Sequence, residues 1–293
     1  MSDVLVTGAT GRVGRRVVAG LMAAGVRVRA LTRAPEAAGL PPGVEVHKGD
    51  LTLPDTLPAA LEGVGRLYLF PVPETAREVA ALAREAGVRR VVVLSSSSVL
   101  EGLEELEELE GGDDEALARN HSALHHLTVE RAVEESGVDW TFVRPDEFAG
   151  NVLWKWRDSI RAEGVVRAPY GKAARALIHE ADVADVAVAA LLEDGHVGGR
   201  YQLTGPATLT QIDQVRAIAE ALGRDIRFEE LSHEEGRAAM SAHMPPPVVE
   251  MVLGYLAAST AVPGPVVPTV RDITGHEPRS FARWAADHVH EFR

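Results

Sequence analysis

The sequence of 293 residues contains no cysteine. This absence excludes disulfide bonds, zinc sites built on thiolates and a cysteine nucleophile, and it is typical of proteins from a reducing compartment. We therefore expect a cytoplasmic protein. With 46% hydrophobic and 25% charged residues, the chain otherwise has the composition of an ordinary globular protein that buries a large core.

Positive charge and long apolar runs are also scarce. The 30 basic residues are outnumbered by 43 acidic ones, which gives a net charge of -13. A surface of this sign repels a phosphodiester backbone, so we exclude nucleic acid as a partner. No apolar run has the length of a membrane span, and a strand-like run directly after Asp3 leaves no room for a signal peptide. We expect a small-molecule substrate, bound by a monomer or a homodimer.

Short apolar runs alternate with amphipathic stretches through the first half of the chain. Such alternation, in βαβ units of similar size, predicts an α/β fold with a doubly wound parallel sheet of the Rossmann type. The expected strands are 4–6, 26–31, 44–46, 66–70, 91–94 and 140–143, and the expected helices are 12–24, 57–61, 74–85 and 122–135.

The pattern loosens after Pro145 and becomes mostly helical. We expect an NADP-binding domain at 1–150 and a smaller substrate lobe at 151–293, interleaved with the first domain into one compact unit. In this second part the expected helices are 152–161, 183–192, 211–222, 234–242, 248–258 and 281–292, and the expected strands are 176–178, 201–203 and 226–228.

One segment, LEGLEELEELEGGDDEA at residues 100–116, has a biased composition. Its leucines recur every three residues, which does not make a stable helical stripe, and its carboxylates repel one another. Composition therefore favours a solvated loop or a frayed helix. Its position after the strand at 91–94 favours instead a lid over the ligand crevice.

The stretch TGATGRVG places Gly8, Gly11 and Gly14 between a buried strand and a helix. In that context glycines allow a tight turn, let the backbone approach a pyrophosphate and let the helix pack on the strand. The helix N-terminus then offers amides and a positive dipole end to the anion. The sequence thus predicts a dinucleotide site whose loop also includes Thr10, Arg12 and Val13.

The end of the second strand indicates which dinucleotide is bound. Proteins that hold NAD by its ribose place an acid there, about twenty residues after the glycines. Here the sequence is Ala-Leu-Thr-Arg at residues 30–33, with no acid before Glu36. Arg33 can grip a 2′-phosphate and Arg12 can assist, so NADP(H) is the expected cofactor. The alternative is that Arg33 is a solvated arginine at the start of a loop.

Further candidate contacts follow the next strands. Asp50 and Leu51 come where adenine should lie, although Gly-Asp is also a common turn. Phe70 and Pro71 make a stiff apolar wall, and residues 95–98 form a run of serines. All of these positions should face the ligand crevice.

The acid-base chemistry is harder to predict. Many short-chain reductases use a tyrosine with a lysine four residues later on one helix, and none of the four tyrosines here has that partner. We consider His126 and His125 the candidate catalytic residues, because Glu130 lies one helical turn after His126 and could orient its imidazole and raise its pKa. They could equally line a cleft without chemistry. His121 and His125 share a face but lack a third ligand, so we expect no metal.

These stretches resemble the NmrA-like group of atypical short-chain dehydrogenases, which includes isoflavone-type reductases, quinone oxidoreductases and non-catalytic NADPH sensors. The resemblance rests on TGATGRVGRRVV, on LTR at 31–33, on GD at 49–50, on VERAVEESGVDWTFVRPDEFAGN at 129–151 and on YQLTGPATLT at 201–210. It covers most of the chain. The long acidic segment departs from the group.

The resemblance implies roles for particular residues. Gly8, Gly11, Gly14 and Arg33 would hold NADPH, and Asp50 would lie near adenine. The nicotinamide would be bordered by Phe70, Pro71, Arg144 and Pro145, and Phe148 and Asn151 would begin the substrate wall. Apart from the resemblance, the serine run adds Ser95 as a candidate cofactor contact. His126 falls where the reductases carry lysine and the quinone oxidoreductase branch carries histidine.

We therefore expect an NADPH-dependent oxidoreductase that transfers a hydride to a small quinone, enone or carbonyl compound, with the proton supplied by His126 or water. A redox sensor that binds NADP(H) without turnover is the alternative from another class, and an epimerase or dehydratase also stays open. The pocket would be lined by Phe70, Ser96, His125, Phe148, Asn151, Trp154 and Tyr170.

Overall fold

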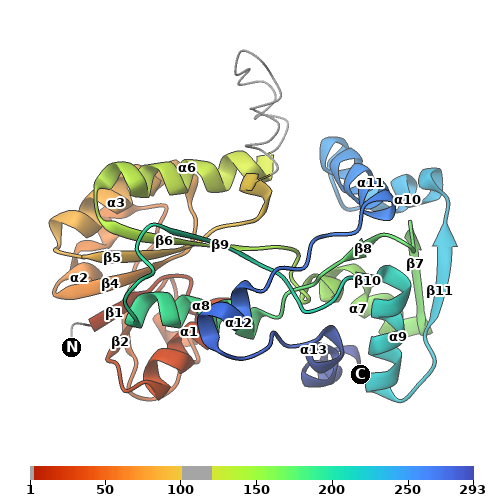
Figure 1. Ribbon diagram of the computed structural model, residues 1–293, viewed down its shortest axis with the longest axis horizontal. Coiled ribbons are helices and arrows are strands. Elements are labelled where there is room, and N and C mark those ends of the chain that lie inside the picture. The colour runs from red at the N-terminus through yellow and green to blue at the C-terminus, as the bar shows by residue number, and fades with distance from the viewer. Residues whose placement is uncertain (1–2, 101–120) are drawn as a thin grey trace, which may run out of the picture. The chain divides into compact units, whose positions relative to one another are not determined.

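The computed structural model describes residues 3–100 and 121–293 (Figure 1). Apart from Leu100, the acidic segment at 100–116 lies outside these residues. Contacts along the chain divide it into two units. The first comprises Met1–Asp146, Glu180–Leu203 and Thr269–His276, and the second comprises Glu147–His179, Thr204–Pro268 and Glu277–Arg293. No helix in the described part combines the length and the apolar character needed to cross a bilayer.

The first unit is built on a seven-stranded sheet with the order β3-β2-β1-β4-β5-β6-β9. All neighbouring strands are parallel, which confirms the predicted doubly wound sheet. The order reverses between β1 and β4, and ligands of such sheets bind outside the carboxyl ends of the strands at this point. The strands are β1 (Asp3–Val6), β2 (Val28–Thr32), β3 (Glu45–Lys48), β4 (Val64–Leu69), β5 (Arg90–Leu94), β6 (Asp139–Pro145) and β9 (Gly199–Leu203).

Helices cover both faces of this sheet, which is why all four residues of β1 are buried. Helix α1 packs against α8 on one face, and α3 packs against α6 on the other. The helices of the first unit are α1 (Arg12–Ala23), α2 (Pro58–Leu61), α3 (Ala76–Glu85), α6 (His121–Ser136), α8 (Glu180–Leu192) and α12 (Thr269–Thr274), with 3-10 turns η1 (Pro35–Ala37), η2 (Pro54–Thr56) and η3 (Pro73–Thr75).

The second unit is mostly helical and has its own apolar core, in which Trp156, Phe281 and Trp284 are buried. Strand β7 pairs with β11 in parallel, and β8 pairs with β10 in antiparallel fashion. The elements are α7 (Asn151–Glu163), β7 (Val165–Pro169), β8 (Ala174–Arg175), β10 (Leu209–Thr210), α9 (Gln211–Leu222), β11 (Arg227–Leu231), α10 (His233–Ser241), α11 (Pro246–Ala261), α13 (Phe281–Asp287) and η4 (Val289–Phe292).

The structure corrects several predicted elements of the later chain. The strand expected at 176–178 is instead the two-residue β8, and only Ile178 forms an isolated bridge. The single helix expected at 281–292 stops at Asp287, because His288 leaves helical geometry with φ -110° and the chain continues as a 3-10 turn. Strand β7 and helix α12 were not expected, since neither segment has a clear apolar period.

Candidate functional site

The predicted cofactor residues follow successive strands of the first unit. Gly8 follows β1, Arg33 follows β2, Asp50 follows β3, Phe70 follows β4 and Ser95 follows β5. Because these strands are parallel neighbours, their carboxyl ends form one edge of the sheet. The structure therefore brings these residues to the edge at which such folds bind ligands.

The glycine loop needs its glycines for backbone reasons. Gly8 has φ +59°, and its carbonyl accepts a hydrogen bond of 2.9 Å from the amide of Gly11. A Cβ on Gly14 would lie 2.1 Å from the oxygen of Gly8. Helix α1 then begins at Arg12 without a side-chain cap, so no capping side chain occupies the first amides of the helix. A closely packed loop that ends in uncapped amides fits a pyrophosphate.

Thr7, which the sequence analysis did not single out, joins the ends of β1 and β4. Its buried hydroxyl donates to the carbonyl of Tyr68 at 3.0 Å and accepts from the amide of Phe70 at 2.7 Å. These two bonds hold the ends of β1 and β4 together at the point where the strand order reverses. The ring of Phe70, 44% exposed, lies 3.1 Å from the position that a Cβ on Gly8 would take. Phe70 therefore forms a wall of the glycine loop.

The arginines expected at the phosphates lie at the surface. Arg12 and Arg33 are both exposed, and neither side chain makes a hydrogen bond or ion pair with any residue that the structure describes. Asp50 accepts two bonds of 2.9 Å from the amide and the hydroxyl of Thr52. These bonds lower the pKa of Asp50, and the positive charge of Arg33 lowers it further. Arg33 and Asp50 thus share one electrostatic environment, as expected for the adenosine end.

Arg15 is a second residue that the sequence analysis missed. Its guanidinium donates to the carbonyls of Thr10 at 3.0 Å, Gly39 at 2.7 Å and Ala38 at 2.7 Å. It thereby connects the glycine loop to the segment after β2, which carries Arg33. No sequence pattern indicated this contact, because backbone carbonyls are acceptors at every position.

A buried charged group occupies the ends of β5 and β6. Arg144 donates to both oxygens of Glu130, at 2.8 and 2.5 Å, and the hydroxyl of Ser95 donates to the same carboxylate at 2.5 Å. All three side chains are buried, and Pro145 is buried beside them. The polar groups of Ser95 and Arg144 are therefore bound within the protein, and their contacts with the cofactor stay predictions.

The expected pairing of His126 with Glu130 is wrong. The carboxylate of Glu130 turns inward to Arg144 and Ser95, and the buried Nδ1 of His126 has no hydrogen-bond partner in the described part of the chain. Burial, followed by the nearby charge of His125, lowers the pKa of His126 to about 4, whereas we expected a raised pKa. The two imidazoles lie 5.0 Å apart, edge to face. His126 is therefore neutral at pH 7.

Ser96 lies at the start of a chain of hydroxyls. The amide and the hydroxyl of Ser98 donate to the hydroxyl of Ser96 at 3.2 and 3.0 Å, and the hydroxyl of Ser98 lies 3.0 Å from that of Ser122 at the start of α6. This chain ties the end of β5 to the helix that carries both candidate histidines. Ser96 itself is half-buried, as a substrate contact requires.

The remaining substrate candidates lie in the second unit. Phe148 precedes α7, and its carbonyl accepts from the amide of Asn151 at 3.0 Å. Trp154, one turn later, is 59% exposed. Tyr170 directly follows β7 and has φ +59°, and its hydroxyl lies 2.8 Å from Nδ1 of His233. Their shared role in binding a substrate stays a prediction.

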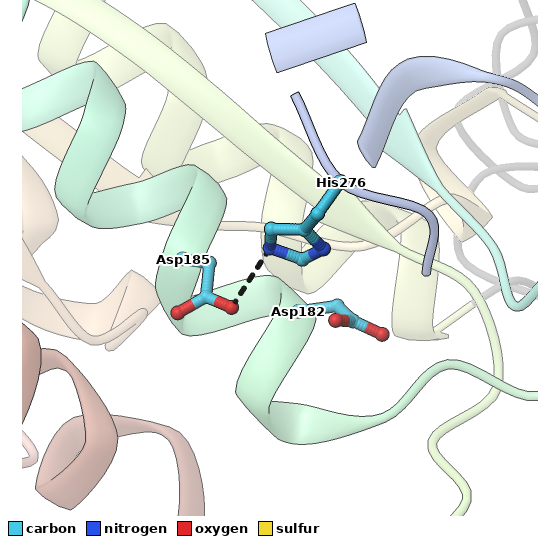
Figure 2. A group of neighbouring side chains, drawn as sticks. All are labelled: Asp182, Asp185 and His276. Carbon is cyan, nitrogen blue, oxygen red and sulfur yellow. Dashed lines mark hydrogen bonds and ion pairs between the residues drawn. The ribbon is translucent and has the colours of Figure 1, made fainter. Parts of the chain in front are cut away.

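One group in the described part of the chain has the chemistry of a metal site, and it lies away from the predicted histidine pair. Asp182 and Asp185 lie one turn apart on α8, and the ring of His276 lies against both carboxylates (Figure 2). Nε2 of His276 lies 3.2 Å from Oδ2 of Asp185. The contact between His276 and Asp185 also holds the segment after α12 to α8. His121 and His125 belong to no such group of described residues.

Comparison with known proteins agrees with this geometry. A family of NAD(P)H-binding proteins matches residues 8–194. The chain is 41% identical to the (4-alkanoyl-5-oxo-2,5-dihydrofuran-3-yl)methyl phosphate reductase of Streptomyces griseus and 33% identical to the NAD(P)H azoreductase of Xenophilus azovorans, with 99% of each chain covered. The structure of the NADPH-dependent quinone oxidoreductase of Escherichia coli, complexed with NADPH, has the same fold, with 24% identity, a TM-score of 0.77 and coverage of 97% of this chain and 99% of that one.

Proposed function

Because the chain belongs to the NAD(P)H-binding, NmrA-like family of atypical short-chain dehydrogenases and is an NAD(P)H-dependent reductase, we propose that it uses NADPH to reduce a conjugated, electron-poor small molecule. The leading acceptor is an enone of the acylated butenolide type, and quinones are the next class. A simple carbonyl compound is the least favoured of the acceptors that the sequence suggests.

The proposed preference for NADPH over NADH rests on Arg33. It follows β2, where proteins specific for NADH place an acid that binds the ribose 2′-hydroxyl. Its guanidinium is exposed and forms no hydrogen bond with another described residue, so it can pair with a phosphate without breaking an internal contact. The glycine loop fits the pyrophosphate of the same cofactor. Its backbone is packed so closely that Gly14 leaves no room even for a methyl group.

The relatives support the choice of acceptor. The furanone reduced by the Streptomyces griseus enzyme has a carbon–carbon double bond flanked by a ring carbonyl and an alkanoyl carbonyl. The other two relatives act on azo compounds and on quinones. In all three classes the electron pair that remains after hydride addition is delocalised onto electronegative atoms. Such acceptors need little help from a strong acid on the protein.

The residues of this chain fit that requirement. The sequence lacks the tyrosine and lysine pair that protonates simple carbonyl compounds, and His126 is neutral at pH 7. Bound NADPH would supply the hydride. The glycine loop and Arg33 would hold its phosphates, Phe70 would exclude water from one side, and solvent water would deliver the proton to the delocalised anion. These roles account for one hydride and one proton added to the double bond.

The proposal is tested by following NADPH oxidation with a panel of acceptors: an acylated butenolide phosphate, a quinone, an azo dye and an unconjugated ketone. We expect turnover of the conjugated acceptors, no turnover of the ketone and at least about tenfold preference for NADPH over NADH. Tight binding of NADPH without turnover of any acceptor would instead support the redox sensor.

A further inference from the structure

We propose that Arg15 is the positioning residue that sets cofactor specificity, by holding the segment that carries Arg33 at a fixed place relative to the glycine loop. This inference rests on the proposed use of NADPH. It concerns a residue whose side chain need not touch the cofactor, because its effect acts through two loops.

The contacts of Arg15 show how one side chain can link both loops. Its Nε donates to the carbonyl of Thr10, inside the glycine loop, while its two terminal nitrogens donate to Gly39 and Ala38. The planar guanidinium has donors on both of its sides, so the two loops are held at one separation. A lysine, whose donors share one nitrogen, cannot reproduce this fork.

The segment after β2 is otherwise held mainly by its own short-range bonds. The amide of Ala34 donates to the hydroxyl of Thr32, and Ala37 and Ala38 close the 3-10 turn η1 through bonds three residues back. Gly39 then takes φ +54°. Arg15 supplies the bonds from this turn to α1, because the carbonyls that it binds are those of Ala38 and Gly39, directly after the turn.

The separation of the two loops matters for NADPH in particular. The 2′-phosphate and the nearer phosphate of the pyrophosphate are attached to the same ribose, so the glycine loop and Arg33 must present their donors at a matching distance. A loop that is already in place spares the ordering cost of binding. NADH has no 2′-phosphate and uses only the glycine loop. Loss of Arg15 should therefore weaken NADPH much more than NADH.

The test titrates the full chain with NADPH and NADH and compares three variants with the wild type. We expect Arg15→Ala to weaken NADPH about tenfold and NADH less than about threefold. Arg33→Ala removes the proposed phosphate contact itself, so we expect it to change the ratio of the two affinities more than Arg15→Ala does. Arg16→Ala is the matched control, since Arg16 is the next residue of α1 and pairs with Glu180 instead. It should leave the ratio unchanged.

Hydrogen exchange provides a readout that a general loss of stability would not mimic. Arg15→Ala should speed exchange in peptides that cover residues 33–40, whereas Arg33→Ala should not. If Arg15→Ala does not fold, Arg15→Lys carries the test, and we expect it to fold and to lose most of the preference for NADPH.

Three results would overturn the inference. Equal weakening of both cofactors would limit Arg15 to the glycine loop, and unchanged affinities for both cofactors would remove its role altogether. A wild type without preference for NADPH, in which Arg33→Ala also changes nothing, would overturn the proposed cofactor together with this inference. Failure to reduce any acceptor would count against the proposed reaction alone, because the binding test does not depend on turnover.

Discussion

The two ends of the binding edge in the first unit are built from different parts of the chain. At β1 and β2 the backbone forms a close-packed glycine loop, in which Gly14 leaves no room for a Cβ, and the side chains of Arg12 and Arg33 stay exposed. At β5 and β6 the side chains of Ser95, Glu130 and Arg144 bind one another and are buried. The first end thus leaves its charged side chains without internal partners, whereas the second end binds its polar side chains to one another.

The prediction with the largest expected effect concerns the negative charge of Glu130 at the β5–β6 end. Glu130→Gln keeps the shape of the side chain but leaves the buried guanidinium of Arg144 without its counter-ion. We expect the free energy of unfolding to fall by about 3–5 kcal/mol, the range for breaking a buried pair from one side. Urea denaturation measures this loss. Under conditions in which the variant is folded, its affinity for NADPH should be nearly unchanged.

Glu134→Gln is the matched control, one turn later on α6. Glu134 pairs with Arg200, but both side chains are partly exposed. Pairs of this kind contribute less than about 1 kcal/mol, so this variant should unfold close to the wild type. If the two variants lose equal stability, the buried group does not hold the ends of β5 and β6 together.

The glycine-loop end could be predicted from the sequence because backbone geometry dictates its residue types. Gly8 needs a positive φ and Gly14 must lie against the carbonyl of Gly8, so glycine is required at both positions. The alternation of apolar and amphipathic segments likewise predicted the parallel sheet, since each strand is covered on both faces. Arg15 was missed because its partners are main-chain carbonyls, one of them 24 residues away.

The second test acts on the backbone-built end. Gly14→Ala would bring a methyl group to 2.1 Å from the oxygen of Gly8, and the loop must shift to accept it. We expect NADPH affinity to fall by about 100-fold, since overpacking costs up to about 3 kcal/mol and the strain falls on the binding loop. Isothermal titration calorimetry measures the change. Gly254→Ala on α11, where a Cβ meets nothing within 4 Å, is the control and should bind NADPH as the wild type does.

The β5–β6 end could not be predicted in the same way, because its partners are set by tertiary packing. Glu130 lies four positions after His126, a spacing that on an isolated helix would favour contact between them. In the fold, Glu130 instead meets a buried arginine from β6 that donates two bonds. A bidentate ion pair away from water is much stronger than a contact along a helix surface, so the local pattern gave the wrong partner.

The smallest test follows the consequence for His126. Its pKa is lowered to about 4, mainly by burial, while the unfolded chain keeps a pKa of about 6.5. Below pH 6.5 the unfolded state binds the proton more readily, so the stability that neutral His126 provides is fully present above about pH 6.5 and falls as the pH drops toward 4. We expect a loss of about 2 kcal/mol at pH 5 relative to pH 7.5.

His126→Gln isolates this loss from the titration of other groups, including His125, which both proteins keep. The difference between the unfolding free energies of wild type and variant, measured in urea from pH 7.5 to 5, should shrink by that amount as the pH falls. A constant difference would mean that His126 titrates normally in the folded protein. Its imidazolium would then be available as a proton donor near neutral pH, and the β5–β6 end would take part in the chemistry as well as in the stability of the sheet.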